Sequence, residues 1–177
     1  SQFLKKKKNH KKNNLGAKNK HINIIFFLII LIIMNELSNF ELLDLIKHHK
    51  LNQYFDGVYS KDQLPTLKPT KFYIVNLEDS DGPGTHWTAF YYSPTNSIYF
   101  DSYGFIAPLE VEKKIKPYIF NDADIQDYNS SACGFYCLCF IKFLHNKTNK
   151  EEAYKHFLKL FSDKTKQNDK ILYELLY

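Results

Sequence analysis

Residues 126–139 read QDYNSSACGFYCLC and contain all three cysteines of the chain. Cys133 differs from the other two, because it follows Ser-Ser-Ala and precedes a glycine, whereas Cys137 and Cys139 lie inside an apolar run. A cysteine attacks a carbonyl as its thiolate, which needs a neighbouring base or cation. Cys133 is therefore a candidate nucleophile, and Cys137 and Cys139 are expected in the core.

A histidine and an aspartate could supply that base. The stretches HWTAFYY (86–92) and SIYFDSY (97–103) predict two strands joined by the loop SPTN. If this loop pairs Tyr92 with Ser97, counting outwards places His86 opposite Tyr103, with Asp101 on the same face. An aspartate next to a histidine stabilises the imidazolium, and a histidine next to a cysteine accepts the thiol proton. The opposite face of the pair is the predicted core face, which leaves these two residues on the more polar one.

The residues around Cys133 complete a possible site for acyl transfer. The apolar run after Ser131 predicts a buried helix that begins at Cys133, with Ser130 or Ser131 as its cap. The helix dipole would stabilise a thiolate at its first residue. Gly134 would let a substrate backbone come close, and the amide of Gln126 could donate a hydrogen bond to the oxyanion.

Each of these residues could also have a purely structural role. A cysteine in an apolar run is usually a core residue, a histidine before a tryptophan in a strand is often structural, and Asp101 could cap a turn. A zinc site is a weak alternative, because C-x3-C-x-C spacing on one helix does not direct three thiolates at one centre. Its ligands would be Cys133, Cys137, Cys139 and His145.

The remaining sequence predicts helices around a small sheet. Ser38 and Glu41 form a capping-box pattern that opens the first helix. The further predicted elements are a helix over about 36–49, a loop over 50–70, a buried strand over 71–77, a helix over 109–116, a short strand over 124–128, and closing helices within 151–161 and 168–177. The expected fold is α+β, with a mostly antiparallel sheet flanked by helices.

Charge separates residues 1–33 from the rest of the 177-residue chain. These 33 residues hold 8 of the 24 lysines and no acid, which leaves 34–177 with 16 lysines against 19 acids, a net charge of −3. The chain has no arginine, so bidentate readout of phosphate or guanine is excluded, and nucleic-acid binding would depend on residues 1–33. Three clustered cysteines form no disulfide framework, which favours a reducing compartment.

Residues 1–33 are a basic stretch followed by the apolar run INIIFFLIILII. The run is shorter than the roughly 18–20 residues that span a bilayer, and no small-residue cleavage site follows it. Because the one methionine is Met34, we interpret 1–33 as a leader or upstream sequence and 34–177 as the working domain. A signal or membrane anchor, and a basic nucleic-acid arm, are the alternatives.

Three motifs in this order carry a family resemblance: GTHW, then FDSYG, then Q-x6-C-G-x-x-C. Together they resemble the adenovirus-type (adenain-like) cysteine maturation proteases, of the kind found in virophages and Polinton elements and related to Ulp1-like SUMO proteases. The likeness runs from Met34 to about His145 and includes QYFDGVYSKDQLP. It implies a papain-like or Ulp1-like fold with the nucleophile at a helix N-terminus.

The resemblance also implies a role for each motif residue. Cys133 would be the nucleophile, His86 the general base and acid, and Asp101 the residue that orients His86. Gln126 would be the oxyanion donor, and Trp87 would pack beside the His–Cys pair. The enzyme would be an endopeptidase that needs neither metal nor cofactor.

By the same analogy the substrate is a viral capsid or virion precursor protein, cleaved in the virion or in the viral factory of the host cytoplasm. Adenoviral members are activated by DNA and by a disulfide-linked peptide. This chain has no cysteine before Cys133 and no arginine, which argues against both activators. Membrane association would depend on residues 1–33. Alternatives are a deubiquitinase- or deSUMOylase-like protease acting on host conjugates, an acetyltransferase on a related fold, and an inactive virion structural protein.

Overall fold

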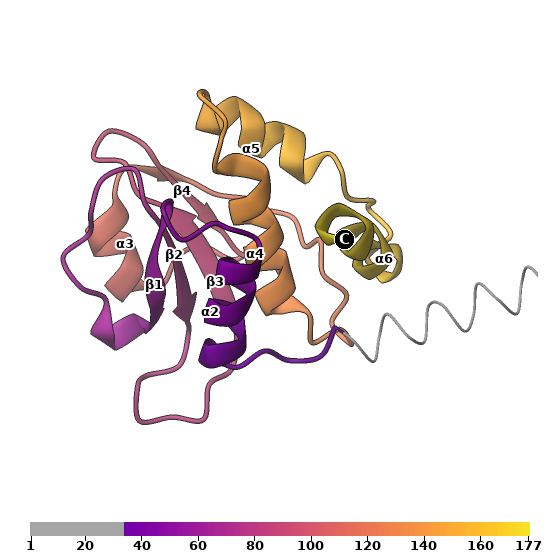
Figure 1. Ribbon diagram of the computed structural model, residues 1–177, viewed down its shortest axis with the longest axis horizontal. Coiled ribbons are helices and arrows are strands. Elements are labelled where there is room, and N and C mark those ends of the chain that lie inside the picture. The colour runs from indigo at the N-terminus through magenta and orange to yellow at the C-terminus, as the bar shows by residue number, and fades with distance from the viewer. Residues whose placement is uncertain (1–33) are drawn as a thin grey trace, which may run out of the picture. The chain divides into compact units, whose positions relative to one another are not determined.

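The computed structural model describes residues 34–177, in which a five-stranded sheet carries helices on both of its faces (Figure 1). The predictions made for residues 1–33 lie outside the described residues. No helix within residues 34–177 combines the length and the apolar character of a membrane span.

The sheet has the strand order β1-β2-β3-β4-β5. The central strand β3 runs antiparallel to both of its neighbours, β2 and β4, and the two edge strands, β1 and β5, pair in parallel with β2 and β4. The strands are β1 (Phe55–Ser60), β2 (Phe72–Asn76), β3 (Trp87–Tyr91), β4 (Ser97–Phe100) and β5 (Tyr118–Ile119). The α+β fold class predicted from the sequence is confirmed.

Helix α4 (Cys133–Leu144) covers one face of the sheet. The ring of Phe140 on α4 stacks on Phe100 of β4 at 5.2 Å and meets Phe72 of β2 edge-on at 5.8 Å. Helices α2 (Asn39–His48) and α5 (Lys150–Leu158) border α4 on this face, and α6 (Asn168–Leu176) packs against α4. Ten of the twelve residues of α4 are buried, which explains why its sequence is apolar all round.

The other face of the sheet is covered by α3 (Leu109–Ile115), and this corrects one prediction. The face that carries His86 and Asp101 was expected to be the more polar one. Instead, Phe90 and Tyr99 on that face are fully buried against Val111 and Ile115 of α3. Both faces of the hairpin are therefore core, and His86 and Asp101 lie at the strand ends.

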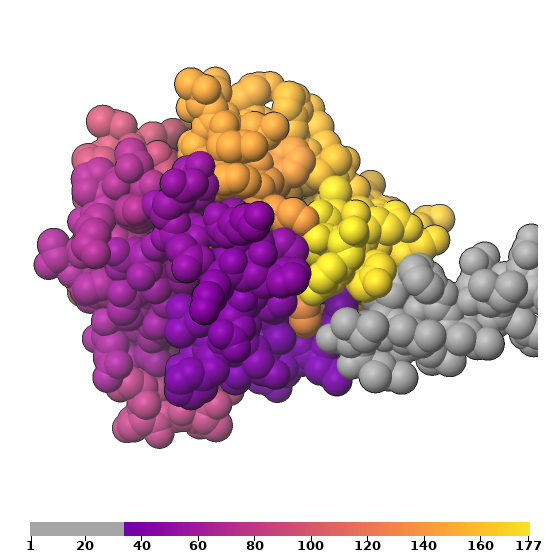
Figure 2. Space-filling view, viewed as in Figure 1, coloured from indigo at the N-terminus to yellow at the C-terminus, as the bar shows by residue number. Residues whose placement is uncertain are grey.

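The two ends of the described unit meet beside α4. In Figure 2 the indigo surface of α2 and the yellow surface of the C-terminal helix lie side by side. The rings of His49 and Tyr177 are 6.1 Å apart at this contact. The C-terminal helices thus help to hold α2 in place.

Most predicted helices are confirmed, and two strand predictions are wrong. Helix α2 begins at the predicted capping box, in which Ser38 and Glu41 each bond to the other's backbone N–H. Strand β1 lies inside the segment predicted as loop, because Asp56 and Gly57 hide its pattern. The predicted strand at 124–128 is a loop, and the short strand lies earlier, at Tyr118–Ile119.

Candidate active site

The hairpin of β3 and β4 brings His86 and Asp101 together. Ala89 pairs with Phe100, which is the predicted register. His86 immediately precedes β3 and Asp101 immediately follows β4, so both lie at the same end of the antiparallel pair. His86 Nε2 is 2.9 Å from Asp101 Oδ1. The predicted pairing of these two residues is thus present in the structure.

Cys133 is the second group that acts on the histidine ring. Its interaction with the His86 side chain contributes to the raised pKa of His86. Because Nε2 faces Asp101, the ring presents Nδ1 as the remaining nitrogen for the sulfur. The structure therefore brings Cys133, His86 and Asp101, which come from three separate segments of the sequence, into one contiguous row.

The electrostatics of this row favour a protonated histidine. Burial opposes the charged ring, whose side chain is 13% exposed. The hydrogen bonds to Asp101 and Cys133 and the negative charges of these two groups outweigh burial and raise the pKa of His86 to about 9. An imidazolium at neutral pH is the partner that a thiolate requires. The arrangement can therefore hold a thiolate–imidazolium pair.

A tight turn fixes the position of Asp101. The Asp101 side chain is fully buried, and its Oδ1 also accepts the backbone N–H of Tyr103 at 2.7 Å. The turn closes when Gly104 N–H donates to Asp101 O at 2.9 Å. Gly104 has φ +76°, and a Cβ there would lie 2.7 Å from the backbone carbon of Ala123. The glycine of the FDSYG motif is thus required by the turn that aims the aspartate.

A second layer of hydrogen bonds, which sequence reasoning missed, holds the backbone of Asp101. Asn121 Nδ2 donates to Asp101 O at 2.5 Å, and Asp101 N–H donates to Asn121 Oδ1 at 3.3 Å. The hydroxyl of Tyr154 on α5 donates to the same Oδ1 at 2.8 Å. Because these partners come from a distant loop and from a distant helix, no local motif could have indicated them.

Tyr103 also belongs to the site. The sequence predicted its position opposite His86 but indicated no role for it. Its ring stacks on His86, with centroids 4.8 Å apart and an interplanar angle of 30°. Its other side stacks on Tyr128 at 5.4 Å, and its hydroxyl donates to Ser130 O at 3.3 Å. An aromatic face over an imidazolium is attractive, so Tyr103 also favours the charged ring. The predicted position of Tyr103 opposite His86 was the one feature of the sequence that could have indicated this contact.

Gln126 is held with little freedom near the same turn. It is fully buried; Ser102 Oγ donates to its Oε1 and its Nε2 donates to Ser130 O, both at 2.7 Å. Its backbone N–H also donates to Ser102 O at 3.0 Å. One hydrogen of its amide nitrogen remains for another acceptor. This geometry is compatible with the predicted oxyanion donor, which stays a prediction.

Helix α4 begins at Cys133 as predicted, but the expected serine cap is wrong. The N-cap residue is Ala132, which has no side-chain hydrogen bond. Ser130 Oγ accepts the N–H of Ala132 at 3.2 Å and does not bond to the helix. The first N–H groups of α4 are therefore left without a side-chain cap. Cys133 is also buried, at 6% exposed.

The segment before α2 explains part of this burial and corrects the role of Gly134. A Cβ on Gly134 would lie 3.2 Å from Leu37 Cβ and 3.3 Å from Leu42 Cδ2. The close approach that this glycine permits is therefore that of the protein's own segment, and not of a substrate. Trp87 Nε1 donates to Leu37 O at 2.7 Å. Leu37 thus contacts the residue next to the candidate base and the residue next to the candidate nucleophile.

Cys137 and Cys139 are core residues, as predicted. Both are buried, and burial raises the pKa of Cys139 to about 12 and that of Cys137 well above its usual value. Neither thiol is therefore a nucleophile near neutral pH. Within residues 34–177, no cluster of three or more His, Cys, Asp or Glu side chains is arranged to hold a metal ion.

Comparison with known proteins identifies the fold. No protein-family model and no curated protein matches the chain. Among solved structures the chain is similar to the crystal structure of the ASFV pS273R protease, with a TM-score of 0.51 and 16% sequence identity. The match covers 81% of this chain and 67% of that chain.

Proposed function

We propose that this chain is a viral cysteine endopeptidase of the adenain-like kind that cleaves capsid or other virion precursor proteins. The observation that carries the proposal is the position of His86 between Asp101 and Cys133, together with its pKa of about 9. The fold it shares with a viral protease, ASFV pS273R, supports the same reaction class. Virophage or related origin, and action in the virion or viral factory, belong to this proposal.

In the proposed reaction the Cys133 thiolate attacks the carbonyl carbon of the scissile peptide bond. The negative charge moves to the carbonyl oxygen, where the free hydrogen of the Gln126 amide and the backbone N–H of Cys133 would stabilise it. The His86 imidazolium then gives its proton to the departing amine as the C–N bond breaks. A thioester between Cys133 and the N-terminal part of the substrate remains.

Hydrolysis of the thioester reverses these roles. Neutral His86 takes a proton from water, and the hydroxide attacks the thioester carbonyl. The C–S bond breaks, the acid product leaves, and the thiolate–imidazolium pair is restored. Asp101 stays ionised throughout and stabilises each imidazolium. The cycle as proposed is complete with these side chains, the peptide and one water molecule.

Alkylation of the thiol tests the site without a known substrate. The chain is treated with iodoacetamide at about pH 6, and labelled cysteines are mapped by peptide mass spectrometry. We expect rapid labelling of Cys133 alone, slowed by His86→Ala, while Cys137 and Cys139 serve as internal controls. Labelling of Cys133 no faster than of the two core cysteines would contradict the proposed pair.

Cleavage assays test the reaction and the substrate class. The chain and its Cys133→Ala variant are incubated with capsid precursor protein, with ubiquitin- and SUMO-fusion proteins, and with acetyl-CoA plus a protein acceptor. We expect cleavage of the precursor by the unchanged chain only. Cleavage restricted to the fusion proteins, or acetyl transfer without cleavage, would replace this proposal with the corresponding alternative.

A further inference from the structure

A pocket of about 690 Å³ opens beside the candidate active site. It lies between the segment before α2 and the loop that joins β2 to β3, and Trp87 forms part of its wall. Trp87 directly follows His86, and Gly84, two residues before His86, also lines the pocket. The volume is sufficient for several residues of an extended peptide, and larger than one side chain needs.

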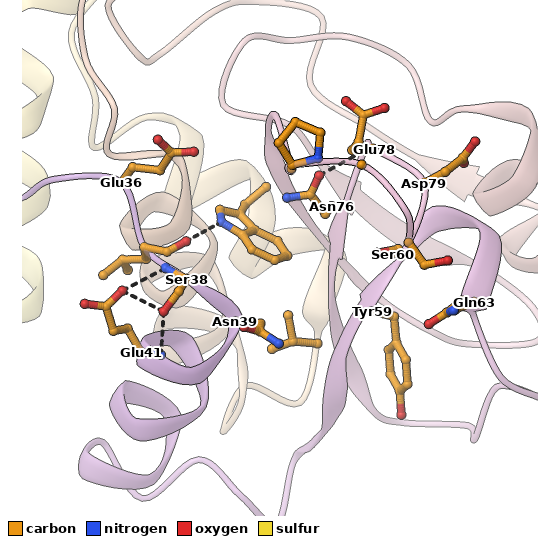
Figure 3. A pocket seen from close by; sticks show the side chains of 17 residues that line it. Glu36, Ser38, Asn39, Glu41, Tyr59, Ser60, Gln63, Asn76, Glu78 and Asp79 are labelled. Atoms are coloured by element: carbon orange, nitrogen blue, oxygen red, sulfur yellow. Dashed lines mark hydrogen bonds between the residues drawn. The ribbon is translucent and has the colours of Figure 1, made fainter.

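The charged groups that line this pocket are all acidic. Four carboxylates belong to its wall, and no lysine or histidine does. The Glu41 carboxylate accepts a hydrogen bond from the Ser38 backbone in the capping box, and Asp79 Oδ1 lies 3.4 Å from Lys61 Nζ. For Glu36 and Glu78, no ion pair or side-chain hydrogen bond is found within residues 34–177. Figure 3 shows these two carboxylates on opposite sides of the pocket.

A buried amide points into the same space, independently of the carboxylates. Asn76 at the end of β2 is 7% exposed, and its Oδ1 accepts the backbone N–H groups of Glu78 and Thr85 at 2.9 and 3.1 Å. Its Nδ2 has no hydrogen-bond acceptor among residues 34–177, and Figure 3 shows this amide between Glu36 and Glu78. Because the Asn76 side chain is largely buried and lines the pocket, the carbonyl of a bound peptide could accept a hydrogen bond from this amide nitrogen.

Gly84 keeps this donor accessible. It has φ +85°, and a Cβ at this position would lie 3.2 Å from Asn76 Nδ2. A side chain here would therefore be strained and would crowd the amide. The pocket thus offers a donor for a backbone carbonyl and two opposed carboxylates that have no ion-pair partner among residues 34–177, and its wall includes the residue next to the candidate general base.

We propose that this pocket is a specificity site that binds a lysine or arginine side chain of the substrate between Glu36 and Glu78, with Asn76 Nδ2 donating to a neighbouring peptide carbonyl. The inference rests on the proposed peptidase function and names one feature of its substrates. Because the pocket wall includes Trp87, the basic residue occupies one fixed position relative to the scissile bond. Neutralising each carboxylate should lower the preference for a basic residue by about three- to fivefold, the effect expected for a solvent-accessible ion pair.

Peptide-library cleavage with the full chain tests the inference. A library of peptides derived from a whole proteome is digested, and the cleaved sites are read by mass spectrometry. We expect Lys and Arg to be enriched at one position, with the enrichment reduced in Glu36→Gln and Glu78→Gln and lost in the double variant. Glu110→Gln, which changes an exposed carboxylate on α3, is the matched control. Cleavage without any basic preference would overturn the inference and leave the peptidase function standing.

If no peptide is cleaved, a binding measurement shows whether the pocket proposal fails or only the peptidase proposal. Fluorescent hexapeptides that carry either lysine or norleucine at each position in turn are titrated onto the Cys133→Ala chain. Tighter binding of the lysine peptides, weakened about three- to fivefold by Glu78→Gln and by added salt, supports the pocket even if catalysis fails. Equal binding of lysine and norleucine peptides would overturn it.

Discussion

Replacement of Asp101 by asparagine would test the ion pair at the centre of the site. An asparagine oxygen in place of Oδ1 can still face His86 Nε2 and the Tyr103 N–H, so the shape of the site is kept. The negative charge is lost. The amide nitrogen would replace Oδ2, which has no hydrogen-bond partner among residues 34–177. The change therefore removes charge with little change in volume.

The size of the effect follows from the pKa of His86. Its increase from 6.5 to about 9 corresponds to about 3 kcal/mol in favour of the imidazolium. Asp101 supplies a hydrogen bond and a charge to this total, and Cys133 supplies the rest. Losing about half of it would lower the pKa of His86 by about one unit, and the ring would still be protonated at pH 6.

Imidazole NMR provides the direct measurement. The ¹⁵N signals of His86 are titrated from about pH 5 to about pH 11 in the unchanged chain and in Asp101→Asn, and Cys133 labelling is timed in parallel. Asp124→Asn, the same change at an exposed loop position, is the control and should match the unchanged chain. An unaltered pKa of His86 in Asp101→Asn would refute the reasoning, because the aspartate charge would then contribute nothing.

Further predictions concern the neighbours of this row. Gln126→Ala should lower turnover of a cleaved peptide by about 10²–10³ without slowing Cys133 labelling, since only the oxyanion is affected. Tyr103→Leu should lower the pKa of His86 by roughly half a unit, measured by NMR, whereas Tyr103→Phe should retain it. Tyr154→Phe should lower the free energy of unfolding, measured with urea, by about 1–2 kcal/mol through loss of the bond to Asn121. Because folding raises the pKa of His86, the protonated ring contributes fully to the free energy of unfolding below about pH 6.5, and this contribution is lost as the pH rises through about 9. The free energy of unfolding in urea should therefore depend less on pH over that interval in His86→Gln than in the unchanged chain.

Each of these expectations has an outcome that would contradict it. Slower labelling in Gln126→Ala would mean that the amide acts on the thiolate. Equal effects of leucine and phenylalanine at Tyr103 would exclude ring stacking as the cause. Unchanged stability in Tyr154→Phe would mean that the bond to Asn121 does not stabilise the fold. An equally steep dependence of stability on pH in His86→Gln would mean that the protonated ring does not stabilise the fold.

The parts of the fold that sequence predicted well depend on local pairing. The register that joins His86 to Asp101 follows from a four-residue loop and alternating strand residues, and the structure confirms it through the Ala89–Phe100 pair. The start of α2 follows from side chains three residues apart. The start of α4 at Cys133 follows from the change between polar and apolar sequence.

What could not be predicted depends on contacts between distant segments. The polar face expected for the hairpin is buried, because α3 folds back over Phe90 and Tyr99. Asn121, which bonds to the Asp101 backbone, lies in a loop, and Tyr154, which bonds to Asn121, lies on α5. Nothing in the local sequence distinguishes this asparagine or this tyrosine from the others in the chain. The role assigned to Gly134 failed for the same reason, since the chain that approaches it comes from the far N-terminal side of the described unit.

The hydrogen bond from Trp87 to Leu37 has a practical consequence for protein engineering. The acceptor is a main-chain carbonyl, so substitutions at position 37 alter the packing on Gly134 but leave the acceptor in place. Deletion removes both. Expression variants that are trimmed from the N-terminal side should therefore retain the residues from Met34 onward, and a fusion tag is better separated from them by a linker. A shorter variant would lose this support for Trp87 and Gly134 while Cys133, His86 and Asp101 are all still present.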